Sequence, residues 1–476
     1  MTTTESDETP QNPLHERYAS QEMKRLFSSR HRYAVWRRIW IVLAESQSEL
    51  GLPITREQIE RLKEVEPMLD LARVAAIEQE TRHDVVAHLR HFAEQAGEAG
   101  GILHLGATSA FITDNTDSIL GRDALRLLAR RLGGVIRNLA AFAERTRGIP
   151  TLGYTHLQPA QLTTVGKRAA LWLQDLVSDL QEVRRRLTEL KCRGAKGTTG
   201  TQASFLELFD QDHGRVRELD SLVAKNLGFS ASWPLTGQTY PRKQDSQTLA
   251  ALAGIAETTH KMGTDIRLLQ GLGVLAEPFG SAQVGSSAMA YKRNPIRSER
   301  MCSLARKLLT DSLNGPLTAA TQWLERSLDD SANRRLVLPD SFLLADAILT
   351  VAADISSGLN VREAATEFLV RRELPFMATE NILMRAVKLG GDRQVLHERI
   401  REYSLEAHAA VERGQDNPLI DKLASDPDFQ LSHDDLTSVL DPIAYIGRAP
   451  QQVEEFLADL ARIDLPESIE AEALRV

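Results

Sequence analysis

Cysteine and aromatic residues are scarce in this sequence. Its two cysteines, Cys192 and Cys302, have no C-x-x-C partner, which excludes a disulfide framework and argues against a zinc site. Aromatic residues make up 5% of the chain. Because Leu, Ala, Arg and Glu are abundant, this balance favours a helical protein over a β-rich one. A chain of 476 residues has room for roughly two to four domains of ~100–200 residues each.

Long apolar runs and an excess of positive charge are also missing. No uninterrupted apolar stretch approaches the ~20 residues that a helix needs to span a bilayer. The net charge of −8 argues against a general nucleic-acid binder. Residues 1–13 are polar and acidic and lack the apolar core of a signal peptide, so we expect a disordered tail there. These features predict a cytoplasmic protein that binds neither nucleic acid nor membrane.

The apolar periodicity predicts an all-α chain with three helical domains. Residues 14–108 indicate medium-length helices, with Trp36 and Trp40 one turn apart on a core face. Residues 109–361 indicate longer helices of a bundle, and residues 362–476 indicate shorter helices broken by prolines. The apolar faces that favour the bundle are formed by Leu125, Leu128, Ala129, Leu132, Ile136 and Leu139, and by Leu173, Leu176, Val177, Leu180 and Leu187.

The segment 285–300 concentrates polar chemistry beside the start of a helix. We expect Asn294 to be the N-cap and Pro295 the first helical residue. The following apolar residues keep helical spacing; they are Met301, Leu304, Ala305 and Leu308. A helix N-terminus attracts anions, so the sequence predicts a carboxylate or phosphate site near Lys292, with a serine hydroxyl close by.

Three other polar clusters are less distinctive. Residues 82–84, Arg-His-Asp, are followed by further histidines, but His83 and His88 lie about 140° apart around a helix, which is poor geometry for a metal. The run 113–117 of short polar side chains predicts a turn and a helix cap. Residues 153–159 place His156 in a loop that ends at a proline.

The segment 285–300 resembles the signature of the fumarase/aspartase superfamily, in the form found in the adenylosuccinate lyases. The resemblance continues in the same order through residues 17–20, 82–84, 104–109, 155–161, 196–204, 236–240 and 329–335. These segments span about 90% of the chain and are most similar to the animal form of the family. One position departs from the pattern, because Ala290 stands where the family usually has a proline, which puts the rigidity of the loop in question.

The resemblance implies a fold and a reaction. The expected fold is a homotetramer whose long central helices bring residues from three subunits into each active site. The expected reaction is β-elimination of fumarate from N6-succinyl-AMP, which gives AMP, and from succinylaminoimidazole-carboxamide ribotide, both in purine biosynthesis. Such a reaction needs a base, an acid and groups that stabilise the charge of a growing dianion, with no cofactor and no metal.

The resemblance also implies a role for individual residues. His156 would be the acid and Ser286 the base, while Lys292 and Asn294 would bind the carboxylate whose charge grows. The succinyl group would be held by Thr108, Ser109, Thr155 and Gln238. The nucleotide and its phosphate would be held by Arg17, Tyr18, Arg82, His83, Asp84, Arg300, Arg326, Ser331 and Arg335.

Several alternatives stay open at this point. A sibling lyase acting on argininosuccinate, aspartate or malate would share the signature, although the arginines at 326–335 favour a phosphorylated substrate. A catalytically silent relative would keep the fold, and Ala290 is the one residue that points to it. A helical interaction module would require the polar clusters to be simple turns. Within the signature, Ser287 is the alternative base.

Overall fold

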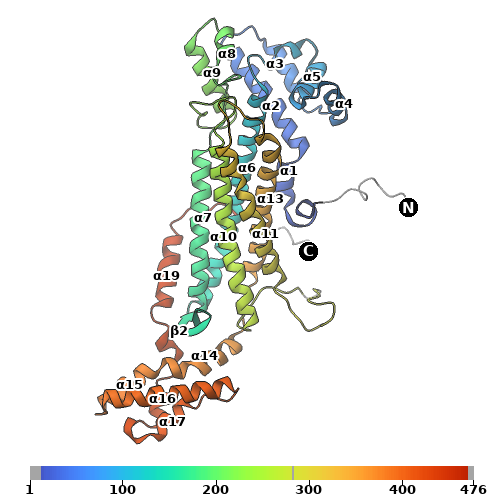
Figure 1. The fold of residues 1–476 in the computed structure, drawn as a ribbon. Helices are drawn as coiled ribbons and strands as arrows, with labels where there is room; N and C mark the ends of the chain where they lie inside the picture. Colours follow the sequence, from blue (N-terminus) through green and yellow to red (C-terminus); the bar gives the residue numbers. More distant parts are fainter. Residues whose placement is uncertain (1–11, 281–282, 470–476) are drawn as a thin grey trace.

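Long helices form an elongated bundle at the centre of the molecule (Figure 1). The computed structural model describes residues 12–280 and 283–469, so residues 1–11 of the expected tail lie outside the described part. The bundle helices are α6 (Ser109–Thr146), α7 (Val165–Glu189), α10 (Lys243–Gly271), α11 (Ile296–Ser312) and α13 (Asp330–Ser357), and short α12 (Asn314–Ala320) lies between α11 and α13.

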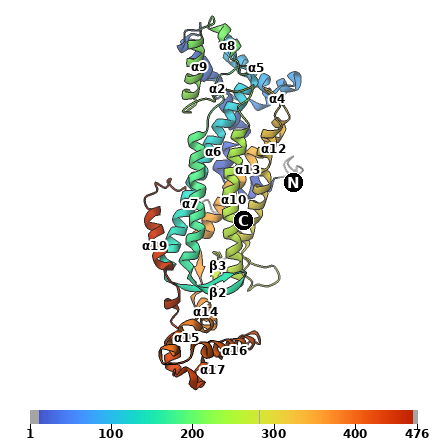
Figure 2. The ribbon, with the colours of Figure 1, turned by 60° about the vertical axis from the view of Figure 1, so that its left-hand side comes forward.

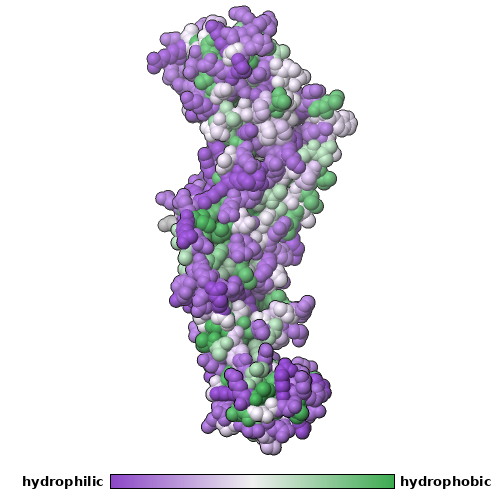
Figure 3. Space-filling view, turned by 90° about the vertical axis from the view of Figure 1, so that its left-hand side faces the viewer, coloured by the Kyte–Doolittle hydropathy of each residue, from purple (hydrophilic) through white to green (hydrophobic). Residues whose placement is uncertain are grey.

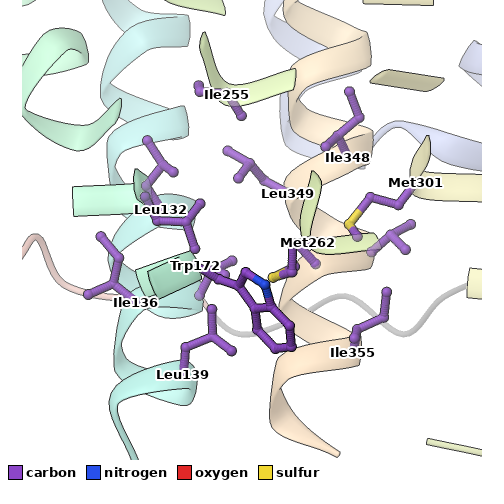
Figure 4. Packing of buried hydrophobic residues seen from close by; sticks show 14 of the residues in the cluster. Leu132, Ile136, Leu139, Trp172, Ile255, Met262, Met301, Ile348, Leu349 and Ile355 are labelled. Carbon is purple, nitrogen blue, oxygen red and sulfur yellow. The ribbon is translucent and has the colours of Figure 1, made fainter. Parts of the chain in front are cut away.

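The bundle core is built from the apolar faces expected from the sequence. Every residue of the two predicted faces packs in one hydrophobic cluster, all buried except Leu187, which is partly buried. Figure 4 shows α6 residues Leu132, Ile136 and Leu139 near Trp172 of α7 and Met262, Leu349 and Ile355. By length and composition α13 could span a membrane, but 72% of its most apolar window is buried in the bundle. The predicted bundle is therefore confirmed.

Helices at one end of the bundle form a second hydrophobic cluster. This cluster buries Trp36 and Trp40, as predicted, with their ring centroids 6.5 Å apart. It also takes in apolar residues between 190 and 229, which the predicted division at residue 108 assigns to the central domain; this division stays a prediction. The elements are α2 (Ser29–Glu49), α3 (Arg56–Val65), α4 (Leu71–Thr81), α5 (Asp84–Ala96), η3 (Gly97–Ile102), α8 (Ala203–Leu208) and α9 (His213–Asn226), while η2 (Leu14–Tyr18) and α1 (Gln21–Leu26) pack on the bundle.

The opposite end carries a hairpin and the shorter helices (Figures 1 and 2). The hairpin pairs β1 (Pro150–Thr155) with β2 (Gln158–Thr164), and β3 (Leu275–Ala276) pairs with β4 (Asn360–Val361). Beyond them lie α14 (Glu363–Met377), α15 (Thr379–Lys388), α16 (Arg393–Glu412), α17 (Leu419–Ser425), η4 (Pro427–Phe429), α18 (His433–Thr437) and η5 (Pro442–Tyr445), and α19 (Ala449–Leu460) packs back on α6 and α7. These two small sheets and one isolated bridge between Cys192 and Ser232 are the whole β content of the described residues, so the all-α prediction is confirmed.

A buried ionic network crosses the bundle near its first end. Arg242 contacts Asp114 at 3.1 Å and Asp330 at 2.6 Å, and Arg334 contacts Asp117 at 3.0 Å. The expectation of a turn and cap at 113–117 is therefore wrong. These residues lie inside α6, because arginines from α13 and from the end of the 236–242 loop satisfy carboxylates that local patterns assign to a cap.

Exposed apolar side chains gather around α12 and the segment that leads into α13. They include Leu313, Leu317, Trp323, Leu324, Leu328 and Leu336. Figure 3 shows that hydrophobic patches also lie among hydrophilic residues along the bundle. Groups of exposed apolar side chains of this kind indicate an interaction surface.

Candidate active site

The candidate catalytic residues and several of the candidate binding residues occupy three separate regions of one chain. The helix-end cluster, at the first end of the bundle, comprises His83, Asp84, Ser109 and Arg335. The hairpin tip, at the other end, comprises Thr155 and His156. The signature loop, residues 285–294, lies between β3 and α11 in the sequence and carries Ser286, Lys292 and Asn294.

Helix termini hold the members of the helix-end cluster. His83 is the N-cap of α5, and its Nε2 lies 3.4 Å from the hydroxyl of Ser109, the first residue of α6. Asp84 Oδ2 lies 2.5 Å from Arg335 Nη2, in the early turns of α13. Arg82, at the left-handed C-cap of α4, and Thr108, the N-cap of α6, flank the cluster. The structure thus brings together residues that are 251 positions apart.

Gln238, Arg326 and Ser331 lie on segments that contact each other. The Gln238 N–H donates to Glu325 O at 2.9 Å, next to Arg326. Arg326 Nη2 lies 3.5 Å from the buried Asp330, beside Ser331. Burial lowers the pKa of Arg326. A half-buried guanidinium of this kind is suited to a phosphate.

The hairpin tip is conformationally unusual. Thr155 pairs with Gln158, which leaves His156 and Leu157 as a two-residue turn. Both have positive φ, 53° and 59°, the pattern of a type I′ turn that normally uses Asn-Gly. Left-handed backbone costs a non-glycine residue about 1–2 kcal/mol. His156 and Leu157 are nevertheless exposed, so the strained tip presents both side chains outward. Strain of this kind is typical of functional sites.

Two backbone N–H groups of the signature loop donate to the hydroxyl of its first serine. Ser286 Oγ accepts from the N–H of Met289 at 3.1 Å and of Ala288 at 3.3 Å. Ser287 and Lys292 are exposed. The Asn294 amide donates to Gly285 O at 2.9 Å, which closes the base of the loop. The arrangement favours Ser286 over Ser287 as the hydroxyl prepared to carry negative charge.

The anion at the N-terminus of α11 is supplied by the protein itself. Buried Glu277 accepts from the N–H groups of Arg297 and Ser298, each at 2.9 Å, and from the Ser298 hydroxyl at 2.8 Å. The prediction that Asn294 caps this helix, with Pro295 as its first residue, is wrong, because α11 begins at Ile296 and Pro295 is its N-cap residue. Glu277 fills the position that the sequence assigns to a substrate anion. The helix face itself is as predicted, since Met301, Ala305 and Leu308 are buried and Leu304 is partly buried.

Arg300 and Tyr18 meet next to this helix start. The Arg300 guanidinium carbon lies 5.7 Å from the centre of the Tyr18 ring. Burial lowers the pKa of Arg300, and the neighbouring charge of Arg17 acts in the same direction. Arg17, on η2, is exposed beside them. These three residues therefore form one basic group near the base of the signature loop.

One chain cannot bring the helix-end cluster onto the same small molecule as the hairpin tip or the signature loop. Ser109 begins α6 and the hairpin follows its end, so the 38 residues of α6 separate them by roughly 57 Å at ~1.5 Å per residue. Arg335 and the signature loop lie near opposite ends of α13, whose 28 residues span roughly 42 Å. The hairpin tip and the signature loop, which carry the candidate catalytic residues, are therefore each held away from the helix-end cluster by a rigid helix.

Comparisons with known proteins agree with this architecture. Residues 16–309 match a lyase family model, and residues 375–456 match the model of the adenylosuccinate lyase C-terminus. The adenylosuccinate lyase of Saccharomyces cerevisiae is 50% identical over 94% of this chain and 93% of its own length. The Schizosaccharomyces pombe enzyme is 49% identical with the same coverage, and that of Pyrococcus horikoshii is 32% identical over 94% of this chain and 97% of its own length.

The chain belongs to the adenylosuccinate lyase family. It is a carbon–nitrogen lyase of the fumarase/aspartase superfamily. Solved structures share the fold: a fumarate lyase from Mesorhizobium sp. BNC1 has a TM-score of 0.79 at 24% identity, covering 94% of this chain and all of its own. A 3-carboxy-cis,cis-muconate lactonizing enzyme from Pseudomonas putida has a TM-score of 0.82 at 22% identity, covering 95% and 99%. At these identities the likeness shows the fold alone.

Sequence reasoning missed residues that hold the family's motifs in place. Glu277 is a single acidic residue in a glycine-dotted stretch, and no local spacing connects it with Ser298. Arg242, which pairs with Asp114 and Asp330, lies just beyond the family-like segment 236–240 and is not part of it. Their function depends on partners far away in sequence, so no signal in one sequence marks them.

Proposed function

We propose that this adenylosuccinate lyase family member eliminates fumarate from N6-succinyl-AMP, giving AMP, and from succinylaminoimidazole-carboxamide ribotide. It would act in purine nucleotide biosynthesis in the cytoplasm, as a homotetramer. The observation that carries the proposal is the Ser286 hydroxyl, which accepts two backbone N–H groups in a loop that also presents Lys292.

Ser286 serves as the base of the elimination. A serine hydroxyl is a weak base, but N–H groups aimed at its oxygen stabilise the alkoxide form. The alkoxide takes the proton from the carbon next to a succinyl carboxylate, and the electron pair forms the double bond of fumarate. Lys292 lies on the same loop and stabilises the carboxylate whose charge grows. Asn294 already uses an amide N–H at Gly285 O, so it contributes its remaining polar atoms.

His156 serves as the acid. As the carbon–nitrogen bond breaks, the leaving nitrogen takes a proton from the imidazole, which protrudes at the hairpin tip. Thr155 lies beside it and binds the succinyl group together with Thr108, Ser109 and Gln238. His83, Asp84 and the arginines at 326 and 335 orient the nucleotide and its phosphate. No step of this proposed chemistry uses a metal or a cofactor.

The site is completed by different copies of the chain. α6 holds the helix-end cluster away from the hairpin tip and α13 holds it away from the signature loop, so a complete site takes the cluster from a different subunit than the other two regions. The exposed apolar side chains around α12 support such contacts, as does the exposed Leu157 at the hairpin tip, 72% accessible in the single chain.

The first experiment follows the ultraviolet absorbance of succinyl-AMP mixed with the purified protein and identifies AMP and fumarate as products. We expect conversion by the wild-type protein and its loss in His156→Ala. Absence of conversion by a folded wild-type protein would contradict the proposed reaction.

Mixing two inactive variants tests the shared site. When His156→Ala and Ser286→Ala chains are coexpressed, about a quarter of the sites draw both residues from intact copies, provided that the two come from different subunits. We therefore expect partial recovery of turnover. No recovery in demonstrably mixed oligomers would place both residues in the site from a single subunit.

A further inference from the structure

Arg193 is a fully buried arginine next to the candidate site, with 0% of its surface exposed. Its guanidinium donates to three backbone carbonyls: Nε to Gln238 O at 2.7 Å, Nη2 to Gly197 O at 2.6 Å and Nη1 to Gly194 O at 3.2 Å. Burial lowers the pKa of Arg193 to about 10, which leaves it charged at neutral pH. A buried charge needs such bonds, so these carbonyls are held in fixed positions.

The segment that follows Arg193 is anchored to the rest of the protein. The N–H of Gly194 donates to Asn115 Oδ1 of α6 at 3.0 Å, and the N–H of Ala195 donates to Asp220 Oδ1 of α9 at 2.8 Å. Lys196 also pairs with Asp220, at 2.5 Å. Arg193 therefore connects Gln238 to backbone that two helices already fix.

Gln238 in turn contacts the segment that carries Arg326. Besides the bond from the Gln238 N–H to Glu325 O, the two backbones touch at Gly237, where an added Cβ would lie 2.5 Å from Glu325 O. An added Cβ at Gly200 would lie 1.8 Å from Thr236 O. Three segments are thus in direct backbone contact: the one that follows Arg193, the one that carries Gln238 and the one that carries Arg326.

We propose that Arg193 is a positioning residue that fixes the Gln238 backbone, and through it the Arg326 segment, in the geometry that binds the succinyl nucleotide. The inference rests on the proposed function, because it takes Gln238 and Arg326 as substrate-binding residues. The planar guanidinium of arginine can donate to carbonyls of two loops at once, whereas a lysine ammonium donates from a single point. Arg193 does not touch the substrate, and its effect reaches the reaction through Gln238.

The test uses the full-length variants Arg193→Lys, Gln238→Ala and the double variant, with succinyl-AMP as substrate. We expect Arg193→Lys to raise KM roughly tenfold while kcat changes less, because binding geometry is lost and the catalytic groups are kept. In the double variant the two effects should combine to less than their product, because part of the Arg193→Lys effect is exerted through the Gln238 side chain. Multiplying effects, or an unchanged KM in Arg193→Lys, would overturn the proposal.

Arg186→Lys is the matched control. Arg186 is also buried, at 4% exposure, and it lies near the end of the preceding helix α7, where it donates to Gln247 Oε1 at 2.8 Å. We expect it to lower the thermal midpoint without raising KM. If both arginine variants raise KM equally, Arg193 has only a structural role.

Two further measurements keep the proposal testable. Should Arg193→Lys fail to fold, Gly237→Ala displaces the same loop at Glu325 O and should also raise KM; an unchanged KM would overturn the inference. Amide hydrogen exchange of residues 236–240 is independent of turnover and should be faster in Arg193→Lys than in Arg186→Lys. Equal exchange would refute the positioning role, whereas absent turnover by the wild-type protein would refute only the proposed reaction.

Discussion

The helix-end cluster and the signature loop contain similar kinds of residue, but they are held in place in different ways. In the cluster, His83, Asp84 and Ser109 sit at helix N-termini, and buried ion pairs of Arg242 and Arg334 lie beneath them. Each side chain is positioned by an element whose other parts are packed in a core. Such residues are suited to binding a substrate with little rearrangement.

The signature loop is held at its base and exposed at its tip. Gln270 donates to Arg293 O at 2.9 Å and accepts from the Glu277 N–H at 3.1 Å, while Glu277 holds the start of α11. Beyond these contacts, Val284 is 77% exposed and Tyr291 is 84% exposed. The comparison shows that the helix-end cluster is fixed by contacts within one chain, whereas the tip of the signature loop is exposed in the single chain.

Ser286→Ala should have the largest effect. It should lower turnover, which depends on the signature loop, and leave AMP binding, which depends on the helix-end cluster, nearly unchanged. Loss of a general base lowers turnover by about 10²–10⁴-fold, while AMP should bind with nearly unchanged affinity because the helix-end cluster is intact. Steady-state kinetics and calorimetric titration with AMP measure the two quantities.

Ser287→Ala is the matched control for the base. Its hydroxyl is exposed, so we expect turnover within a few-fold of wild type. Normal turnover in Ser286→Ala, together with loss in Ser287→Ala, would transfer the role of base to Ser287.

Local patterns in the sequence were sufficient to predict the helices and to find the motifs, but not to predict which distant residues they contact. The apolar faces of α6 and α7 follow from spacing alone, and the signature loop is found by its residue order. Asp114 lies 128 residues from Arg242, so its run of short polar residues resembles a cap until the partner is known. The same limit applies to Asn294. The sequence predicts that it caps α11, but Glu277, which precedes the loop, accepts the N–H groups of that helix instead.

The hairpin tip shows a second limit. His156 is expected in a loop, but His-Leu is not a sequence that predicts a type I′ turn. Strands β1 and β2 impose the positive φ at both residues through their pairing. The conformation of the candidate acid therefore follows from the pairing of the two strands and not from the preference of His and Leu themselves.

Glu277→Ala should weaken the signature loop at its base. The change leaves two N–H groups and the buried Ser298 hydroxyl without their acceptor, which destabilises the fold by about 1–3 kcal/mol. Because the loop is then misplaced, kcat should fall roughly tenfold. Thermal unfolding and kinetics with succinyl-AMP give both values.

Asp392→Ala is the control for loss of a cap. Asp392 caps α16 by accepting from the N–H groups of Gln394 and Val395, at 2.9 and 3.1 Å, on a helix outside the three site regions. Its removal should lower stability by about 1 kcal/mol with kcat unchanged. If Glu277→Ala behaves in the same way, the loop base does not affect the chemistry.

Ala290→Pro gives the smallest expected effect and tests the departure from the family pattern. Ala290 follows Met289 in a turn closed by the Lys292 N–H donating to Met289 O at 3.0 Å. This is position i+1 of the turn, where proline is favoured, and Ala290 is exposed. Proline there should stabilise the loop by about 0.4–1 kcal/mol, chiefly by restricting its other conformations. We therefore expect kcat/KM to rise by about two- to fivefold.

Ala288→Pro makes the same substitution two residues earlier and should act in the opposite direction. It removes the N–H that donates to Ser286 Oγ at 3.3 Å, so the alkoxide loses a stabilising group and kcat should fall. Unchanged kinetics in Ala290→Pro would mean that the alanine is neutral and that the turn is already formed without proline. A fully active Ala288→Pro would remove the support that the backbone gives to Ser286, and with it the reason for preferring this serine as the base.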